Sequence, residues 1–251
     1  MVRPLADWRP LLLAVLLLVG TVSLGGAYAQ APYRLTWGKG LAVGGAAATT
    51  IALGEYYSAR LELLREDQLA GLDAARDVWA LDRLATRQRS ATAKAISDVT
   101  GYGSMLLPLA LLAGGNGRDY VPEWGAVYAQ AFALNYGLTS LTKNTVRRSR
   151  PYVYDAGVPL ADKQVRDARR SFFSGHTSLA AVNCYFTAQA FSDLYPASPA
   201  RGWVWAGAAA VPAVTGLTRV LAGKHYWTDV AVGYAVGAGV GLLVPRLYRR
   251  D

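Results

Sequence analysis

The sequence predicts an all-α protein, a membrane-embedded bundle of about six core helices. Five segments of about 15 to 22 residues carry no Asp, Glu, Lys or Arg, and roughly 20 residues are needed for a helix to cross a bilayer. No segment shows the apolar–polar alternation of half-buried strands. The buried helices of a soluble bundle would look similar, because Ala and Gly replace much of the expected Leu and Ile. The uncharged segments are residues 99–117, 124–142, 171–192, 202–218 and 230–245.

The first 29 residues have the pattern of an export signal. Two arginines precede an apolar run from Leu11 to Val19, and small residues follow up to Ala29. A basic start, an apolar stretch and an A-x-A end make up a secretory signal. We interpret residues 1–29 as a signal peptide cleaved after Ala29, with an uncleaved N-terminal anchor as the alternative. In either case the chain engages a membrane export route.

Residues 30–98 are predicted to form an N-terminal amphipathic helical region. Within it, residues 37–53 are rich in Gly, Ala and Thr and are weak as a membrane span. Residues 55–94 are charged, and their leucines recur at roughly helical spacing, which predicts surface or interfacial helices. The total length suits one good-sized core, which we assign to residues 99–251.

The formal net charge is +9, and the excess is local: residues 143–170 hold eight Lys or Arg and three Asp. Such a cluster needs an anionic partner, which leaves phosphate, nucleic acid or an anionic membrane surface open, beside a solvated loop. Within it, Arg148 and its neighbour Arg147 are interpreted as surface charges or membrane contacts. Cys184 is the single cysteine, which excludes an intrachain disulfide framework.

The chain has two histidines, His176 and His225, each in a small polar segment at the start of an apolar helix. His225 and Asp229 are four residues apart, so on a helix they share one face. A carboxylate there fixes the imidazole tautomer and makes the other nitrogen a better nucleophile. Arg219, just upstream, can grip an anion near that nitrogen.

The segment around the other histidine suits phosphate. Gly175 has no side chain to block a ligand, and the N–H groups around Ser174 at a helix N-terminus can point at phosphate oxygens. Lys143 and Arg150 supply positive charge, and arginine can bind phosphate through two hydrogen bonds.

The order and spacing of these residues resemble the three-part signature of the type-2 phosphatidic acid phosphatase (PAP2) superfamily, whose site resembles that of vanadium haloperoxidases. The resemblance covers roughly residues 99–245. Phe173 stands where Pro often precedes Ser-Gly-His, and Thr218 where Ser often precedes Arg; neither change removes a catalytic group. The matching motifs are Lys143-x6-Arg150-Pro151, Ser174-Gly175-His176 and Arg219-x5-His225-x3-Asp229.

The resemblance implies a PAP2/haloperoxidase-like fold and a phosphatase acting on phosphate monoesters or diphosphates. His225 would attack phosphorus, Asp229 would orient it, and His176 would protonate the leaving oxygen and then activate water. The implied partners are a phosphorylated lipid or a small phosphate, and the membrane. The resemblance implies no metal ion, no cofactor and no nucleic acid. The phosphoryl oxygens would be bound by Lys143, Arg150, Ser174, Gly175 and Arg219.

Three other functions stay open: a soluble periplasmic non-specific acid phosphatase, a vanadate-dependent haloperoxidase, and a non-catalytic envelope protein with a decayed site. Haloperoxidases are typically much larger, and the presence of every motif residue argues against decay. The substrate and the oligomeric state stay open as well.

The expected location is the inner membrane of a bacterial-type cell envelope, with the site facing the periplasm. All three motifs must lie at one end of the bundle, and the basic tail at residues 246–250 then lies at the other end, which the positive-inside rule assigns to the cytoplasm. The basic cluster at residues 143–170 argues for the opposite orientation, unless its charges bind phosphate. After cleavage of a signal, a periplasmic site also requires that residues 37–53 do not span.

Overall fold

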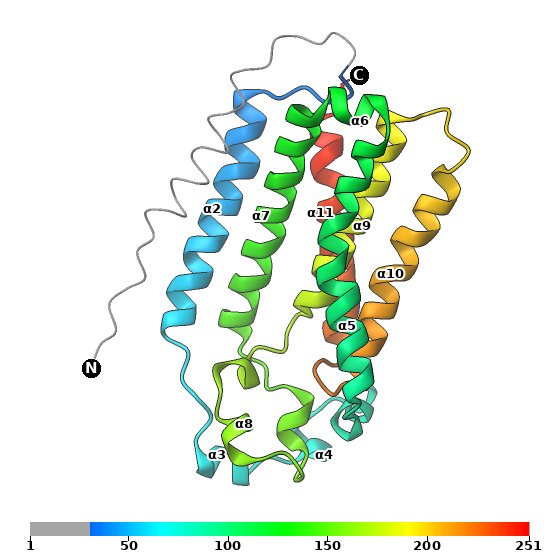
Figure 1. The fold of residues 1–251 in the computed structure, drawn as a ribbon. Coiled ribbons are helices and arrows are strands. Elements are labelled where there is room, and N and C mark those ends of the chain that lie inside the picture. The colour runs from blue at the N-terminus through cyan, green and yellow to red at the C-terminus, as the bar shows by residue number, and fades with distance from the viewer. Residues whose placement is uncertain (1–30, 251) are drawn as a thin grey trace.

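The computed structural model describes residues 31–250, so the predicted signal segment lies outside the described residues. Within that range the regular secondary structure is helical, apart from one isolated bridge between Tyr33 and Arg249, and Figure 1 shows long helices standing side by side. The prediction of a helical bundle of about six core helices is confirmed. Its columns are α2 (Trp37–Ala59), α5 (Ala91–Gly103) continued by η3 (Ser104–Ala113), α7 (Val121–Val146), α9 (Gly175–Leu194), α10 (Arg201–Leu221) and α11 (Trp227–Tyr248).

Helix α9 is the centre of the bundle. It packs against α5, η3, α7, α10 and α11, and 14 of its 20 residues are buried. A helix covered on every side needs small or apolar residues all round, and α9 has them, with Val182 and Phe186 in the main hydrophobic core. Its first residue follows Ser174, whose hydroxyl accepts a hydrogen bond from the Thr177 N–H and so caps the helix.

Glycines bring α11 close to α9. Gly233, Gly237 and Gly241 are spaced by four residues and share one face of α11. A Cβ at Gly233 would lie 2.6 Å from the carbonyl oxygen of Ser174, and only glycine permits so close an approach of two backbones. The Ser174 N–H also donates to the Asp229 carbonyl at 3.0 Å. The start of α9 is therefore fixed against the first turns of α11.

Helix α2 packs lengthwise on α7 and belongs to the same bundle. Small residues make this contact: a Cβ at Gly54 would lie 2.8 Å from the Ser140 hydroxyl, and the Asn144 side-chain amide donates to the Gly54 carbonyl at 3.0 Å. The weak apolar stretch at residues 37–53 is therefore part of a helix that runs the full length of the bundle.

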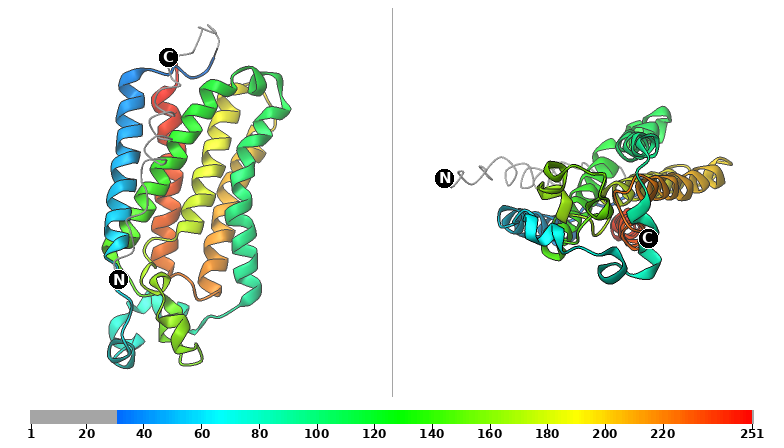
Figure 2. Two further views of the ribbon diagram at one scale, coloured as in Figure 1. Left: turned by 60° about the vertical axis from the view of Figure 1, so that its left-hand side comes forward. Right: turned by 90° about the horizontal axis from the view of Figure 1, so that it is seen from below.

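A cap of short helices covers the end at which α7 and α10 finish and α9 and α11 begin (Figures 1 and 2). Two segments far apart in sequence form this cap, residues 60–90 and 147–174. They pack through small apolar clusters, one of which joins Ala85 to Tyr226 and Val230. The cap helices are α3 (Glu66–Ala70), α4 (Ala74–Asp77), η2 (Ala80–Arg87), η4 (Pro151–Tyr154), α8 (Leu160–Lys163) and η5 (Arg166–Arg169), whereas α6 (Gly115–Asp119) lies at the opposite end.

The two ends of the described chain meet at the end of the bundle opposite the cap. The Arg34 N–H donates to the Tyr248 carbonyl at 2.7 Å, and the Arg250 N–H donates to the Pro32 carbonyl at 3.0 Å. The Tyr33 hydroxyl donates to Asp193 of α9 at 2.9 Å. Residues 31–36 and 248–250 are thus clamped together, and α2 carries the chain from this clamp to the cap (Figure 1).

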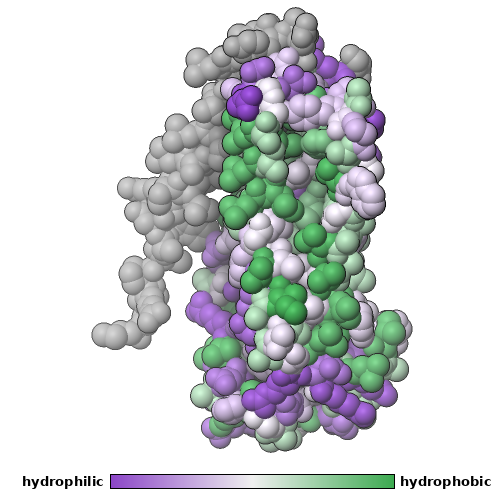
Figure 3. All heavy atoms as spheres, turned by 45° about the vertical axis from the view of Figure 1, so that its right-hand side comes forward, coloured by the Kyte–Doolittle hydropathy of each residue, from purple (hydrophilic) through white to green (hydrophobic). Residues whose placement is uncertain are grey.

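Three helical segments are long and apolar enough to cross a membrane by length and composition: residues 91–113, α10 and α11. Large apolar side chains are exposed along them, including Leu106, Trp203 and Leu243. Figure 3 shows apolar side chains along the middle of one face and polar ones at both ends, most densely at the cap end. Helices α7 and α9 do not reach the same hydropathy. Helix α9 lies at the centre, where neighbouring helices cover most of its side chains.

Candidate active site

The eight predicted site residues meet at the cap end of the bundle. The C-terminal part of α7 and the loop after it bring Lys143 and Arg150, and the start of α9 brings the Ser174–His176 turn. The last turn of α10 and the beginning of α11 bring the rest. Six of the eight are buried: Lys143, Arg150, Ser174, Arg219, His225 and Asp229.

His225 lies between a carboxylate and a guanidinium. Its Nδ1 is 3.5 Å from Asp229 Oδ2, and its Nε2 is 3.4 Å from Arg150 Nη1. The sequence expectation put His225 and Asp229 on one helix, but α11 begins at Trp227, so His225 precedes it. The turn at Tyr226 nevertheless brings the imidazole beside the carboxylate, at a distance where the attraction is electrostatic rather than a well-formed hydrogen bond.

The surroundings of His225 favour its neutral form. The side chain is 1% exposed, and burial is the largest cause that lowers its pKa well below the ordinary value, followed by the positive charges of Arg150 and Lys143. An unprotonated imidazole is the form that can attack an electrophile. The site therefore places an imidazole whose neutral form is favoured next to cationic groups.

Three donors hold the Asp229 carboxylate. The Ser171 hydroxyl donates to Oδ2 at 2.5 Å, and the Tyr226 N–H donates to the same oxygen at 3.0 Å. Arg148 Nη1 donates to Oδ1 at 2.7 Å. Asp229 is fully buried, so these contacts fix its position beside His225.

The expectation that Arg148 is a surface charge was wrong, because this arginine pairs with two buried carboxylates of the site. Its side chain is only about a quarter exposed, and its guanidinium pairs with Asp82 at 2.8 Å as well as with Asp229. It also stacks 3.9 Å from the centre of the Tyr226 ring. Burial by itself would lower the pKa of Arg148, but the charges of Asp229 and Asp82 hold it above its ordinary value.

Asp82 of η2 is fully buried and completes this network. Its Oδ2 accepts hydrogen bonds from Arg148 Nη2 at 2.8 Å and from the Thr228 hydroxyl at 2.6 Å. Its Oδ1 accepts the Thr228 N–H at 3.1 Å. Residues 60–90 therefore reach into the site through one carboxylate.

The cationic side chains are anchored by neighbouring groups. Arg150 Nε donates to the Asp167 carbonyl at 2.8 Å, and Nη2 donates to the Asp167 carboxylate at 2.6 Å. Lys143 Nζ donates to the Arg170 carbonyl at 2.7 Å. A Cβ on Gly175 would lie 3.3 Å from the Lys143 side chain. This cluster of basic side chains next to the Ser174–His176 turn can hold a phosphoryl group.

His176 contacts an acid that the sequence did not single out. Its Nε2 is 3.1 Å from Asp98 Oδ1 of α5, and Arg219 Nη1 is 3.1 Å from the same oxygen. Lys94 Nζ donates to the other oxygen at 2.8 Å. The Tyr102 ring packs edge-on against the imidazole, with ring centres 4.8 Å apart. Helix α5 therefore forms the wall of the site on the side of His176.

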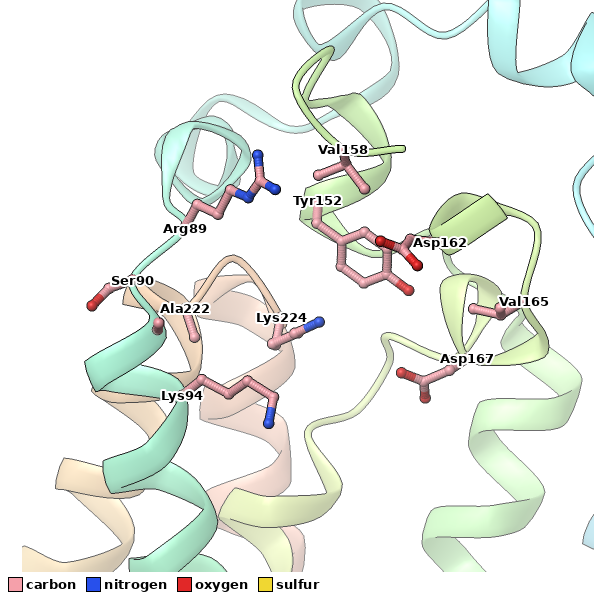
Figure 4. Close-up of a pocket in the computed structure, with 11 residues that line it drawn as sticks. Arg89, Ser90, Lys94, Tyr152, Val158, Asp162, Val165, Asp167, Ala222 and Lys224 are labelled. Carbon is pink, nitrogen blue, oxygen red and sulfur yellow. The ribbon is translucent and has the colours of Figure 1, made fainter. Parts of the chain in front are cut away.

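A cavity of about 500 Å³ adjoins the site, between the cap and the ends of α5 and α10 (Figure 4). Lys94, Lys224, Tyr152 and Asp167 are among its lining residues. Lys224 Nζ lies 4.4 Å from the Tyr152 ring centre, and burial together with the charges of Arg150 and Arg219 lowers its pKa. Lys224 directly precedes His225 in the sequence, so the cavity lies next to the segment that carries this histidine.

Three residues of the site were not predicted from the sequence, and they differ in whether a sequence motif could have indicated them. Arg148 lies within the Lys143–Arg150 motif, and that position was a usable signal. Asp82 and Asp98 lie outside every motif and carry no comparable signal. Within residues 31–250, no three His, Cys, Asp or Glu side chains gather where they could hold one metal ion.

Comparison with known proteins gives a family and several relatives. The sequence model of the PAP2 superfamily matches residues 124–251. Phosphatidylglycerophosphatase B of Bacillus subtilis is 30% identical over 149 residues, which cover 57% of this chain and 68% of that protein. Phospholipid phosphatase 1 of Mus musculus is 35% identical over 165 residues, 54% of this chain and 56% of that protein.

Two further similarities complete the comparison. Lipid A 1-phosphatase of Rhizobium johnstonii is 36% identical over 133 residues, 52% of this chain and 50% of that protein. The chain thus spans about half the length of the Mus musculus and Rhizobium johnstonii relatives. The crystal structure of a transmembrane PAP2-type phosphatidylglycerolphosphate phosphatase from Bacillus subtilis aligns over 96% of both chains, with a TM-score of 0.43 and 17% identity.

Proposed function

Because this chain belongs to the PAP2 superfamily, we propose that it is a phosphatase that hydrolyses phosphate monoesters or diphosphates of membrane lipids. The reaction runs through a phosphohistidine intermediate on His225. One observation carries the proposal: the buried imidazole of His225, whose surroundings lower its pKa, lies between the Asp229 carboxylate and the Arg150 guanidinium.

In the first step, Nε2 of His225 attacks phosphorus. The N–P bond forms as the bond to the leaving oxygen breaks, and that oxygen takes a proton from His176. Positive charge develops on the phosphorylated imidazole, and the Asp229 carboxylate on the Nδ1 side stabilises it. Burial, followed by the positive charge of Arg219, lowers the pKa of His176 to about 4, and the nearby Asp98 carboxylate acts in the opposite direction, toward the protonated imidazole that this acid role needs.

In the second step, His176 takes a proton from water, and the resulting hydroxide attacks phosphorus. The N–P bond breaks, phosphate leaves, and both histidines return to their starting states. Lys143, Arg150 and Arg219 bind the phosphoryl oxygens in both steps and stabilise the charge in the transition states. Ser174 and Gly175 complete the phosphate cradle. These groups supply the positive charge without a metal ion.

A lipid phosphate is the preferred substrate class. The site lies at the end of a bundle whose flanks expose apolar side chains, where a lipid headgroup would meet it directly. The names of the relatives from Bacillus subtilis, Mus musculus and Rhizobium johnstonii all refer to lipid phosphates, which supports the same class. A soluble periplasmic acid phosphatase is the second candidate, because α2, α7 and α9 do not qualify as membrane spans on hydropathy.

We propose that the site faces the periplasm. The basic tail at residues 246–250 lies at the opposite end of α11, and the positive-inside rule assigns that end to the cytoplasm. Residues 31–36 are clamped to the tail, so they lie on the cytoplasmic side too. In a bundle that spans the membrane, this orientation therefore requires that residues 1–29 do not deliver Gln30 to the periplasm.

The purified protein tests the activity directly. Phosphate release is measured on phosphatidic acid, phosphatidylglycerol phosphate, a polyprenyl diphosphate, lipid A and an aryl phosphate. We expect turnover of at least one lipid phosphate, acid-labile phosphate on the wild-type protein, and neither for His225→Ala. The matched control is Asp67→Asn, an exposed acid in the cap. Turnover by His225→Ala near the wild-type rate would overturn the mechanism.

A further inference from the structure

A row of charges leads from the N-terminal part of the chain to the nucleophile. Asp82 pairs with Arg148 at 2.8 Å, Arg148 pairs with Asp229 at 2.7 Å, and Asp229 lies 3.5 Å from His225. Both carboxylates are fully buried. Asp82 lies on η2, outside the segment that matches the PAP2 superfamily.

The arrangement raises a problem of charge. Arg148 binds Asp229 through a short ion pair, and a guanidinium at that distance largely cancels the field of a carboxylate. Asp229 alone with Arg148 would therefore offer little net negative charge to the phosphorylated imidazole of His225. In a buried site such a positive charge is costly unless a negative charge compensates it.

Asp82 restores the missing charge. Two carboxylates and one guanidinium carry a net charge of −1, which matches the single positive charge that develops on His225. The second pairing of Arg148 also divides its hydrogen bonds between the two acids, so that Asp229 keeps one oxygen for the Ser171 hydroxyl and the Tyr226 N–H. This oxygen is the one nearest His225.

We propose that Asp82 is a positioning residue of the reaction, which balances the charge of Arg148 and so leaves the charge of Asp229 available to His225. This inference rests on the proposed phosphohistidine mechanism. It assigns residues 60–90 a part in the site: the cap supplies a charge that the family signature lacks. A purely structural role makes a different prediction, in which Asp82 only ties η2 to the first turn of α11 through Thr228.

A double-mutant cycle separates the two roles. Asp82→Asn keeps the size of the side chain and removes its charge, which leaves Arg148 opposed only by Asp229. We expect kcat to fall on the order of tenfold to a hundredfold. A nearby charge typically changes the pKa of an ionisable group by about 1 to 2, and the charged imidazole of His225 should lose stabilisation by a similar factor. KM should change much less, because Asp82 touches no group that binds phosphate. Asp67→Asn serves as the matched control and should match the wild type.

The double variant Asp82→Asn/Arg148→Gln gives the decisive comparison. Removing the arginine returns the net charge to −1, so the double variant should turn over several times faster than Asp82→Asn alone. If Asp82 is purely structural, the two losses multiply and the double variant is the slowest of the set. That result, or an unchanged kcat in Asp82→Asn, would overturn the inference.

A second measurement does not require the single variant Asp82→Asn to fold, because it compares Arg148→Gln with the double variant. Arg148→Gln removes a positive charge near His225, so the acid limb of kcat/KM should move to higher pH, and adding Asp82→Asn should move it back. No movement between these two variants would count against the charge role. Wild-type turnover and phosphate trapping are measured in the same experiment. If the wild type shows neither, the proposed function fails, whereas normal wild-type behaviour with unresponsive variants refutes the role of Asp82 alone.

Discussion

Replacing Gly233 by alanine should displace the Ser174–His176 turn, which packs against this glycine, and so lower activity. A Cβ there would lie 2.6 Å from the carbonyl oxygen of Ser174 and 3.3 Å from its nitrogen, and both are backbone atoms that no rotamer change can move aside. Real Cβ contacts are essentially never shorter than 3.0 Å, so the Ser174–His176 turn must shift by at least 0.4 Å. Overpacking of this kind costs about 1–3 kcal/mol, and a misplacement of about 1 Å can slow a reaction on the order of a hundredfold.

The assay is kcat/KM on an aryl phosphate together with thermal unfolding in detergent. We expect Gly233→Ala to lose about tenfold or more in kcat/KM. Its Tm should fall by about 2–4 °C for each kcal/mol of lost folding stability. Gly239→Ala on the same helix is the matched control, because nothing lies within 4 Å of its Cβ. Alanine also improves helix propensity by about 1 kcal/mol at both positions, so their difference isolates the close contact. Equal behaviour of the two variants would refute this reasoning.

Four other predictions follow from the site. His176→Ala should slow hydrolysis of an aryl phosphate less than that of a lipid phosphate, since a good leaving group needs little protonation; equal losses would contradict the acid role. Because the pKa of His225 is lowered, its neutral form persists below pH about 6.5, the ordinary value, and kcat/KM, corrected for substrate ionisation, should fall only well below that pH. An acid limb centred near the ordinary value would contradict it. Activity should survive EDTA and be inhibited by vanadate, which mimics the five-coordinate transition state; restoration by a divalent ion after EDTA would count against this. Active protein should sediment with membranes until detergent is added, and its recovery in a detergent-free supernatant would favour the soluble candidate.

The motif residues could be predicted because their chemistry is local in sequence. The Ser-Gly-His turn and the pair His225 and Asp229 each occupy a few consecutive residues, so spacing alone suggested which groups share a site. The structure adds that His225 precedes α11 and that its Nδ1 lies 3.5 Å from the carboxylate. That detail depends on the turn at Tyr226, whose shape spacing cannot give.

The supporting residues could not be predicted in the same way. Asp82 reaches Arg148 across 66 positions of sequence, and nothing near Asp82 distinguishes it from the other acids of a charged region. Helix α2 was underestimated for another reason. Its contact with α7 uses Gly54 and neighbouring small residues, and close packing of small residues leaves no mark in a hydropathy pattern.

Because residues 31–36 are clamped to the tail, the presence or absence of residues 1–29 in the mature protein indicates how the bundle is oriented in the membrane. In a spanning bundle, cleavage after Ala29 would leave the new N-terminus in the periplasm, and the clamp would hold the tail there, so the cap would face the cytoplasm. An intact N-terminus that stays in the cytoplasm would place the tail in the cytoplasm and the cap in the periplasm. A cleaved chain recovered without detergent would identify an exported protein that is not embedded in the bilayer. Mass spectrometry of one terminal peptide, combined with fractionation, therefore reports which compartment supplies the substrate.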